Sequence, residues 1–187
     1  MMSLGHDPHR SEGSVKVPLY QTSTFEFASA AEGKEFFASK DSGYIYSRLD
    51  NPNLRVAEER LRTWDGAERC LLFGSGMSAI STTLLATLRP GDVLVHSHPL
   101  YGCTDFIATG FLREFGITPV AVTADMTERD VDAAIDAAAP GGRLGMILLE
   151  TPANPTLDLF DLDMFVAIAE RRSRPQDRAL VAVDNTF

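Results

Sequence analysis

From residue 70 onward, short apolar runs alternate with longer amphipathic stretches. The runs CLLF, DVLVH, ITPVAVT, MILLE and ALVAVD have the length and composition of buried strands. Helical spacing of apolar residues follows them, over MSAISTTLLATL, TDFIATGFLREF, DMTERDVDAAIDAAAP and FDLDMFVAIAERRS. Apolar strands that alternate with amphipathic helices predict the α/β class, with a mostly parallel sheet covered by helices on both faces.

Residues 1–50 lack a strong period, apart from an extended VPLYQTSTFEF and a short helix expected at EGKEFFASK. A longer helix follows, with Asn51 as its cap, Pro52 in its first turn and Gly66 at its end. Its apolar face is expected to contain Leu54, Ala57, Leu61 and Trp64. We therefore predict an N-terminal arm over residues 1–50 and a sheet domain over residues 51–187.

The composition is that of an ordinary globular protein, since 44% of the 187 residues are hydrophobic and 23% are charged. The formal net charge of −9 disfavours nucleic-acid binding, because phosphate recognition needs clustered basic residues. The basic run Arg171-Arg172-Ser173-Arg174 is expected in the last turn of a helix, on a solvated face.

Cys70 and Cys103 are the two cysteines, and their spacing fits neither a metal site nor a redox pair. The first residues, MMSLGHDPHRSEGS, lack the apolar core of a signal peptide, and no later run has the length of a membrane span. We expect a reduced, cytoplasmic setting and no membrane contact.

Two histidines, His96 and His98, form an H-x-H pattern at a strand end, which is one way to bind a metal. No cysteine or carboxylate at a suitable spacing completes a ligand set. We therefore predict turn or solvent-facing histidines and no metal site.

Ligands of open parallel sheets bind outside the carboxyl ends of the strands, which here carry FGSGMS, HSHPLYG, ETPANP and DNTF. In the first, the N–H groups of Gly76 and Met77 open a helix after Ser75, and such groups bind anions. The stretch is neither a nucleotide P-loop nor a dinucleotide fingerprint, and a tight turn without a ligand is the commoner use of such glycines.

Three further side chains follow strand ends. Tyr101 opens a helix, where its ring stacks on a planar ligand or simply packs. Asn154 lies between two prolines, which aim its amide or make an ordinary turn. Asp184 ends an apolar strand expected to be buried, so its charge needs a cationic partner, either a ligand nitrogen or an arginine.

Together, an anion site, an aromatic ring, an amide and a carboxylate at one sheet edge suit a planar, phosphorylated heteroaromatic cofactor with a protonatable ring nitrogen. Pyridoxal 5′-phosphate has these features, and its protonated ring accepts electrons from a substrate carbanion. The stretches YSRLDNPN, FGSGM, LRPGD, LYGCT, ETPANP and VDNTF closely resemble the Cys/Met-metabolism (transsulfuration) family of pyridoxal-phosphate enzymes. The resemblance runs from VPLYQTSTF to the end of the chain and implies the type I fold of that enzyme class.

The resemblance implies a role for each matching residue. Tyr46 and Arg48 of the arm would bind the cofactor phosphate of a neighbouring subunit, in a homodimer that is usually doubled to a tetramer. The remaining roles belong to the chain's own site: Ser75, Gly76 and Met77 at the phosphate, Tyr101 on the ring and at the leaving group, Asn154 at the ring hydroxyl or substrate carboxylate, and Asp184 at the ring nitrogen.

The chain also departs from the family pattern. Asn53 stands where the family usually has threonine. The family's cofactor-binding lysine lies downstream of VDNT, whereas the lysines here are Lys16, Lys34 and Lys40, all in the arm. We therefore expect this chain to be the N-terminal part of a longer enzyme and to be inactive alone.

The implied reaction is elimination or replacement at Cγ of methionine- or homoserine-type amino acids. Cys103, two residues after Tyr101, favours a lyase like methionine γ-lyase and is a candidate catalytic residue. The alternatives are replacement, as in cystathionine γ-synthase or O-acetylhomoserine sulfhydrylase, a non-catalytic assembly partner that lacks the lysine, and a plain phosphate-ligand binder.

Overall fold

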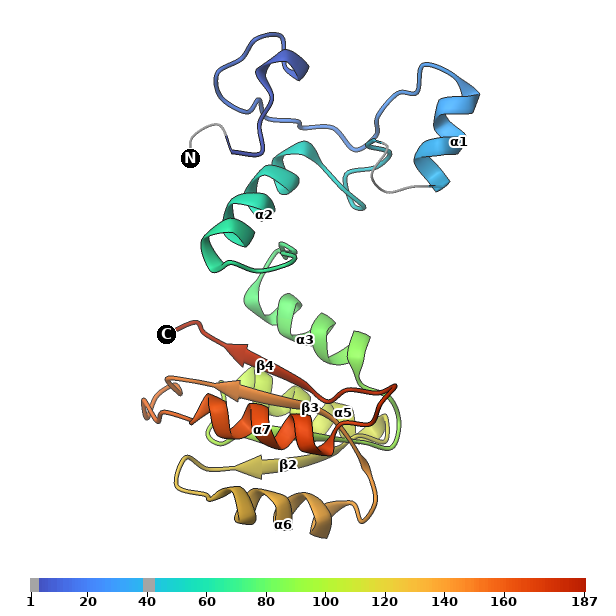
Figure 1. Cartoon of the computed structure of the whole chain (residues 1–187). Helices are drawn as coiled ribbons and strands as arrows, with labels where there is room; N and C mark the ends of the chain where they lie inside the picture. The colour runs from blue at the N-terminus through green and yellow to red at the C-terminus, as the bar shows by residue number, and fades with distance from the viewer. Residues whose placement is uncertain (1–3, 39–42) are drawn as a thin grey trace. The chain divides into compact units, whose positions relative to one another are not determined.

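The computed structural model describes residues 4–38 and 43–187, so Lys40 lies outside the described residues. The chain divides into two compact units (Figure 1), the arm unit, Met1–Phe73, and the sheet unit, Gly74–Phe187. Helix α2 therefore belongs with the arm, although the sequence pattern changes character near residue 51.

Four parallel strands form the sheet of the second unit, in the order β2-β1-β3-β4. They are β1 (Asp92–Ser97), β2 (Thr118–Val122), β3 (Arg143–Glu150) and β4 (Leu180–Asp184). The expected α/β class and parallel sheet are confirmed. The strand predicted at CLLF is wrong, because residues 70–73 have no strand partner and the Leu72 N–H donates to Glu58 of α2, 2.9 Å away.

Helices precede or connect the strands (Figure 1). They are α3 (Gly76–Thr87), α4 (Gly102–Asp105), the π-helix η2 (Phe106–Phe111), α5 (Leu112–Glu114), α6 (Glu128–Ala138) and α7 (Leu162–Arg172). The single helix expected over TDFIATGFLREF is thus one helical segment with a π turn in its middle.

Each face of the sheet has its own core. On one face, Val95, Ile147 and Leu149 pack in a cluster that includes residues of α6 and α7. On the other, Leu94 and Met146 pack with residues of α3, η2 and α5. The central strands β1 and β3 supply residues to both clusters, as the period of a strand requires, and the predicted cover on both faces is confirmed.

The strand β4 lies at the edge of this sheet. Leu180 is 44% exposed and Val183 is 42% exposed. The prediction of a buried strand at ALVAVD is therefore wrong in this structure, because β4 has a neighbour only on the β3 side.

Arginines tie elements of the sheet unit together. Arg143, at the start of β3, pairs with buried Asp92 and with Asp177. Arg171 and Arg172 end α7, as predicted, but they are not simply solvated. Both contact Asp132 of α6, at 2.6 Å each, so this basic run joins two helices.

In the arm unit, the 3-10 helix η1 (Pro8–Arg10) and α1 (Ala30–Ala38) precede α2 (Pro52–Asp65). Asn51 caps α2 and Gly66, at φ 64°, ends it, as predicted. The expected apolar face is largely uncovered, with Leu54 40%, Leu61 37% and Trp64 64% exposed. Val56 is the buried residue of α2.

Polar side chains hold the arm to α2. Asn53 donates to Pro18 O at 2.7 Å and accepts from the Tyr20 N–H at 2.8 Å. Asn51 donates to Tyr20 O at 3.1 Å and to Ser47 Oγ at 3.0 Å. The residue that departs from the family pattern thus makes two bonds to the arm backbone. Among the described residues, no helix is long and apolar enough to span a bilayer.

Candidate functional site

Three neighbouring strands end at the same edge of the sheet. β1 ends at Ser97, β3 at Glu150 and β4 at Asp184, and Glu150 and Asp184 are partners in the register of their strands. The loops after these strands begin with the stretches that the sequence singled out. Parallel strands bring their carboxyl ends to one edge, so the topology itself gathers these residues.

The amino end of α3 carries the predicted anion site. Ser75 is its N-cap and accepts from the Ser78 N–H at 3.1 Å, in a capping box. The N–H groups of Gly76 and Met77 have no acceptor within the helix, as at any helix start. A Cβ built on Gly76 would meet nothing within 4 Å, so there is open space beside this residue at the helix start.

A direct contact joins this helix start to the Tyr101 region. Thr104 Oγ1 lies 3.7 Å from Met77 Sδ, and Thr104 is 1% exposed. Thr104 belongs to α4, which begins just after Tyr101. The helix start and the predicted aromatic residue therefore share one neighbourhood within the sheet unit.

Tyr101 is held by its backbone and free at its ring. Its N–H donates to Glu150 Oε2 at 2.7 Å, and its side chain is 46% exposed. The Cys103 thiol beside it raises the pKa of the Tyr101 hydroxyl above its ordinary value. A phenol is protonated at neutral pH at its ordinary pKa of about 10, and the upward shift keeps it so.

Asn154, like Tyr101, is held through its backbone N–H by Glu150. Its N–H donates to Glu150 Oε1 at 2.8 Å, and the residue is half-buried. The loop around it is closed by the Ala153 N–H, which donates to Asp158 O at 3.0 Å, and by Leu157, at φ 60°. Asn154 thus belongs to a loop whose backbone is held by hydrogen bonds.

Asp184 is half-buried at the end of the edge strand. Its Oδ1 accepts from the Thr186 N–H at 3.1 Å and from Thr186 Oγ1 at 2.5 Å. The predicted arginine alternative finds no support, since no ion pair of Asp184 occurs in the described part of the chain. The carboxylate is thus bonded by its own turn.

The two histidines have different surroundings. His96 is 2% exposed, and its Nδ1 lies 3.0 Å from Ser97 O. It lies two residues after Leu94 in β1, so it is on the sheet face where Leu94 packs with residues of α3. Burial lowers the pKa of its imidazole. The prediction of a turn or solvent-facing residue is wrong for His96, because β1 continues past it, while His98 is exposed. No group of metal ligands forms among the described residues.

Glu150 is the site residue that the sequence reasoning missed. It is 3% exposed, and its two oxygens accept from Tyr101 and Asn154. The signal was available, because Glu150 follows the apolar MILL just as Asp184 follows LVAV. A carboxylate at the end of a buried strand requires partners in either case.

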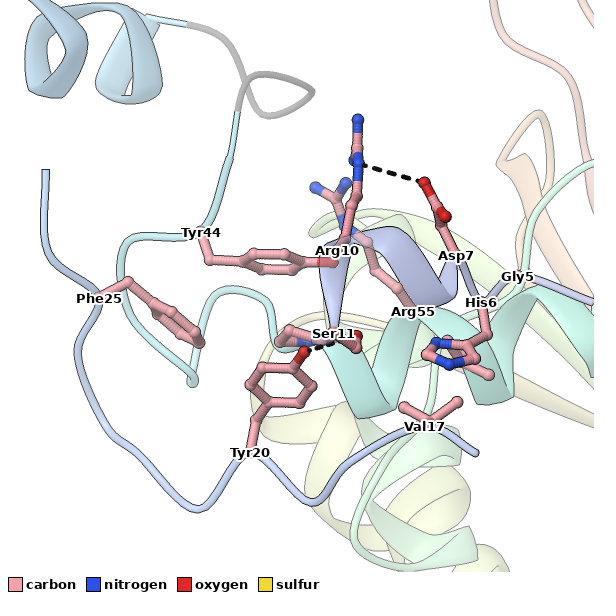
Figure 2. Close-up of a pocket in the computed structure, with 12 residues that line it drawn as sticks. Gly5, His6, Asp7, Arg10, Ser11, Val17, Tyr20, Phe25, Tyr44 and Arg55 are labelled. Carbon is pink, nitrogen blue, oxygen red and sulfur yellow. Dashed lines mark hydrogen bonds and ion pairs between the residues drawn. The ribbon is translucent and has the colours of Figure 1, made fainter. Parts of the chain in front are cut away.

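The arm unit holds the two remaining predicted residues. Tyr46 forms an isolated bridge with Thr24, and the exposed Arg48 lies over the Tyr46 ring, 5.4 Å from its centroid. A hollow of about 420 Å³ in this unit is lined by neither of them. Figure 2 shows Tyr20, Phe25 and Tyr44 among its lining residues, and Arg55 lies over the Tyr44 ring, 4.9 Å from its centroid.

The donor set at the sheet edge fits a planar, phosphorylated cofactor. Uncapped N–H groups and open space at Gly76 suit a phosphate, the exposed Tyr101 ring suits a flat heterocycle, and the Asp184 carboxylate suits a cationic nitrogen. Glu150 and the buried His96 are hydrogen-bonded within the protein itself, and His98 is exposed. The arrangement therefore favours binding of an organic phosphate over binding of a metal.

Comparison with known proteins identifies relatives over nearly the whole chain. The family model described as "Cys/Met metabolism PLP-dependent enzyme" matches residues 1–187. The L-methionine gamma-lyase of Pseudomonas putida is 38% identical over 183 residues, which cover 98% of this chain and 43% of that protein. The O-succinylhomoserine sulfhydrylase of Pseudomonas aeruginosa is 33% identical, over 94% of this chain and 41% of that protein.

A solved structure has the same fold. It is the metY protein of Campylobacter jejuni, which contains N′-pyridoxyl-lysine-5′-monophosphate. The TM-score is 0.80 at 25% identity, over 96% of this chain and 42% of that one. The chain therefore spans less than half the length of the proteins it matches.

Proposed function

Because the chain belongs to the Cys/Met-metabolism family of pyridoxal-phosphate-dependent enzymes, we propose that the whole protein eliminates the γ substituent of methionine-type amino acids. The relative from Pseudomonas putida is a lyase of this kind. Cys103, beside Tyr101, is the residue that the resemblance associates with the lyases. The products are a thiol, a 2-oxo acid and ammonia.

The sheet unit supplies the cofactor contacts. The N–H groups of Gly76 and Met77 bind the phosphate, with Ser75 holding the helix start in place. Asp184 balances the positive charge of the ring nitrogen, and Tyr101 packs on the ring. Asn154 donates its amide to the ring hydroxyl or to the substrate carboxylate. Bound in this site, pyridoxal 5′-phosphate supplies an electron sink for a negative charge at the substrate Cα.

Tyr101 also acts on the leaving group. A thiol leaves far more easily when its sulfur receives a proton. The Tyr101 hydroxyl is the proton donor, because a phenol with the ordinary pKa of about 10 is protonated at neutral pH, and the Cys103 thiol raises that pKa further. Tyr101 is 46% exposed, which leaves its side chain accessible to a substrate.

The observation that carries this proposal is the assembly of one edge from separate stretches. Met77 contacts Thr104 next to Tyr101, and Tyr101 and Asn154 both bond to Glu150, whose strand partner is Asp184. The resemblance assigns the cofactor lysine to a position downstream of Asp184, so activity is tested in the whole protein that contains this chain.

The test is an assay with L-methionine alone, following 2-oxobutanoate and ammonia. We expect turnover, a visible absorption band of the bound cofactor, and a loss of about 100-fold or more in Asp184→Asn. Tyr101→Phe should keep the band, because the ring remains, and lose about 100-fold in kcat, because the proton donor is gone. A protein without the band, or one in which Asp184→Asn retains full activity, contradicts the proposal.

A second candidate is γ-replacement on an activated homoserine. The relative from Pseudomonas aeruginosa is a sulfhydrylase. The same residues would hold the cofactor, and the difference would lie in which nucleophile is accepted. The replacement reaction would be favoured if the protein does not turn over methionine alone but turns over O-succinylhomoserine when sulfide is added.

We further propose a cytoplasmic homo-oligomer, usually a dimer of dimers, in which Tyr46 and Arg48 reach a neighbouring subunit's phosphate. Large apolar side chains of the arm unit are exposed, among them Val15 (81%), Leu19 (79%) and Leu71 (73%). A partner surface would cover such residues. Both cysteines are free, which agrees with a reducing compartment.

Mixing two inactive variants tests the shared site. If Arg48 acts across the subunit boundary, Arg48→Ala mixed with Asp184→Asn forms hybrid dimers with one intact site, which restores about a quarter of the wild-type sites. If both residues serve the same subunit, mixing restores nothing. A non-catalytic assembly partner predicts no activity of its own in either case.

A further inference from the structure

The carboxylate of Glu150 holds two loops at the candidate site. It is 3% exposed at the end of β3, a central strand with β1 on one side and β4 on the other. A buried carboxylate is costly unless its oxygens are bonded. Ion pairs with arginine, lysine or histidine do not involve it anywhere in residues 4–38 and 43–187.

Its partners are instead two backbone N–H groups. Oε2 accepts from Tyr101 at 2.7 Å, and Oε1 accepts from Asn154 at 2.8 Å. Tyr101 is 49 residues away in the chain, in the loop after β1, whereas Asn154 is in the loop after β3 itself. One side chain therefore bonds a separate loop through each oxygen.

The backbone of Glu150 is fixed as well. Its N–H donates at 2.9 Å to Ser97 Oγ, and Ser97 is fully buried at the end of β1. The carboxylate thus projects from a position that the sheet and Ser97 both hold. Two loops bonded to such a group have a fixed separation from one another.

In both loops the backbone N–H of the bonded residue is held, at the exposed Tyr101 and at the half-buried Asn154. Tyr101 begins α4 without a side-chain cap, so Glu150 binds the N–H just before that helix, and the ring stays 46% exposed. Asn154 is bonded at its N–H and half-buried. This arrangement fixes where the two side chains start and leaves their functional ends to a ligand.

We propose that Glu150 is the positioning residue that sets the position of the Tyr101 ring relative to the Asn154 amide, the two groups that the proposed function places at the face and at the hydroxyl of the cofactor ring. A carboxylate suits this task because both of its oxygens accept hydrogen bonds. Glutamine offers one oxygen and one NH₂ group, so it leaves one of the two N–H groups without an acceptor. The inference rests on the proposed function for the identity of the ring, but the two bonds are tested without it.

The first experiment needs no activity. Hydrogen–deuterium exchange at single-residue resolution is measured in the whole protein without added cofactor. In the wild type, the amides of Tyr101 and Asn154 should be protected. In Glu150→Gln, at least one of them should exchange about 10- to 100-fold faster, as expected for losing a bond to a charged group, while β1 and β3 remain protected.

Asp92→Asn is the matched control. Asp92 is also 3% exposed and also accepts a backbone N–H, that of Arg89 at 2.7 Å, but it lies at the amino end of β1. This variant should lower the melting temperature and leave exchange at Tyr101 and Asn154 unchanged. If both variants accelerate exchange there equally, or if neither does, the positioning role is refuted.

The second experiment asks whether the relative position of Tyr101 and Asn154 matters for cofactor binding. Pyridoxal 5′-phosphate should bind Glu150→Gln about 10-fold more weakly than the wild type, with a weaker circular dichroism band of the bound cofactor, and Asp92→Asn should match the wild type. If affinity and band are unchanged despite faster exchange, the positioning by Glu150 does not contribute to cofactor binding, and that part of the proposal is overturned.

Two safeguards keep the outcomes distinct. If the wild type binds no pyridoxal 5′-phosphate, the proposed function fails while the exchange data still decide whether Glu150 holds the loops. If Glu150→Gln does not fold, Ser97→Ala takes its place, since it removes the acceptor of the Glu150 N–H and should accelerate exchange at Tyr101 or Asn154. Unprotected wild-type amides at Tyr101 and Asn154 refute the proposal without any variant.

Discussion

The arm unit and the sheet unit are stabilised in different ways. Among the described residues, every buried apolar side chain except Val56 lies in the sheet unit. That unit has two clusters, one on each face of its sheet. The arm unit instead relies on polar side chains such as Asn51 and Asn53, which bond the backbone of residues 18–20.

This difference teaches where the protein's stability and its dependence on partners lie. Buried apolar area is the main favourable term in folding, so the sheet unit has the means to fold as a unit. The arm unit exposes much of its apolar surface, including Leu19 and Leu71, and its hydrogen bonds each contribute little net free energy. We therefore expect substitutions to act globally in the sheet unit and locally in the arm unit.

The largest effect is expected for Ile147→Ala, in the middle of β3. Ile147 is 0% exposed within the cluster beneath α6 and α7, so truncation leaves a cavity and should cost about 3–4 kcal/mol of unfolding free energy. Denaturant unfolding measures it. Val183→Ala, on the exposed edge strand, is the control and should cost under about 1 kcal/mol. Equal losses would contradict the assigned core.

Next in size is Asn53→Ala in the arm unit. It removes both bonds to residues 18 and 20, worth about 1–3 kcal/mol together, and the loss should be local. Limited proteolysis should cut within residues 15–30 much faster, with little change in the unfolding of the sheet unit. Asn53→Thr offers a single side-chain oxygen, so its rate of cleavage should lie between those of the wild type and Asn53→Ala. A global loss as large as that of Ile147→Ala would remove the distinction between the units.

A pH-dependent effect of intermediate size is expected from His96. Burial lowers the pKa of its imidazole in the folded protein, whereas the unfolded chain has the ordinary value near 6.5. Between those two values the unfolded state binds more protons, so stability falls as the pH drops through 6.5, by at most about 1.4 kcal/mol per pH unit. His96→Gln should flatten this slope when melting is followed from pH 7.5 to 5. An unchanged slope would assign the acid sensitivity to other groups.

The smallest effect is expected for Arg171→Ala. Its ion pairs with Glu128 and Asp132 are partly exposed, so removing them should cost about 0.5 kcal/mol or less, and less still in high salt. Urea unfolding at two salt concentrations measures the change. A loss comparable to that of Asn53→Ala would mean that surface charges support the sheet unit more than its core burial implies.

Much of the fold was predictable because its signals are local. Residues 92–97, 118–122, 143–150 and 180–184 are apolar runs between turn residues, and the structure has strands there. The failure at CLLF has a physical reason. Residues 70–73 have strand composition, but a strand also needs a neighbour for its backbone, and Leu72 bonds to Glu58 instead.

The candidate site was predictable only in part. Tyr101, Asn154 and Asp184 were found because turn or polar residues stand out after apolar strands. Glu150 follows the same rule, but its role depends on Tyr101, which is 49 residues away in the chain. The burial of His96 was missed for a similar reason, since its environment comes from helices that the pattern of β1 does not report.

By itself, the sequence determined the elements, the parallel order implied by their alternation, and the stretches that reach the carboxyl edge, because hydrophobic period and turn chemistry act over a few residues. Tertiary structure alone decided which strand is at the edge, which histidine is buried, and which carboxylate binds both site loops. Those properties depend on contacts between residues far apart in the chain, and the free energy of a buried charge or an unpaired backbone group is set by its neighbours in space.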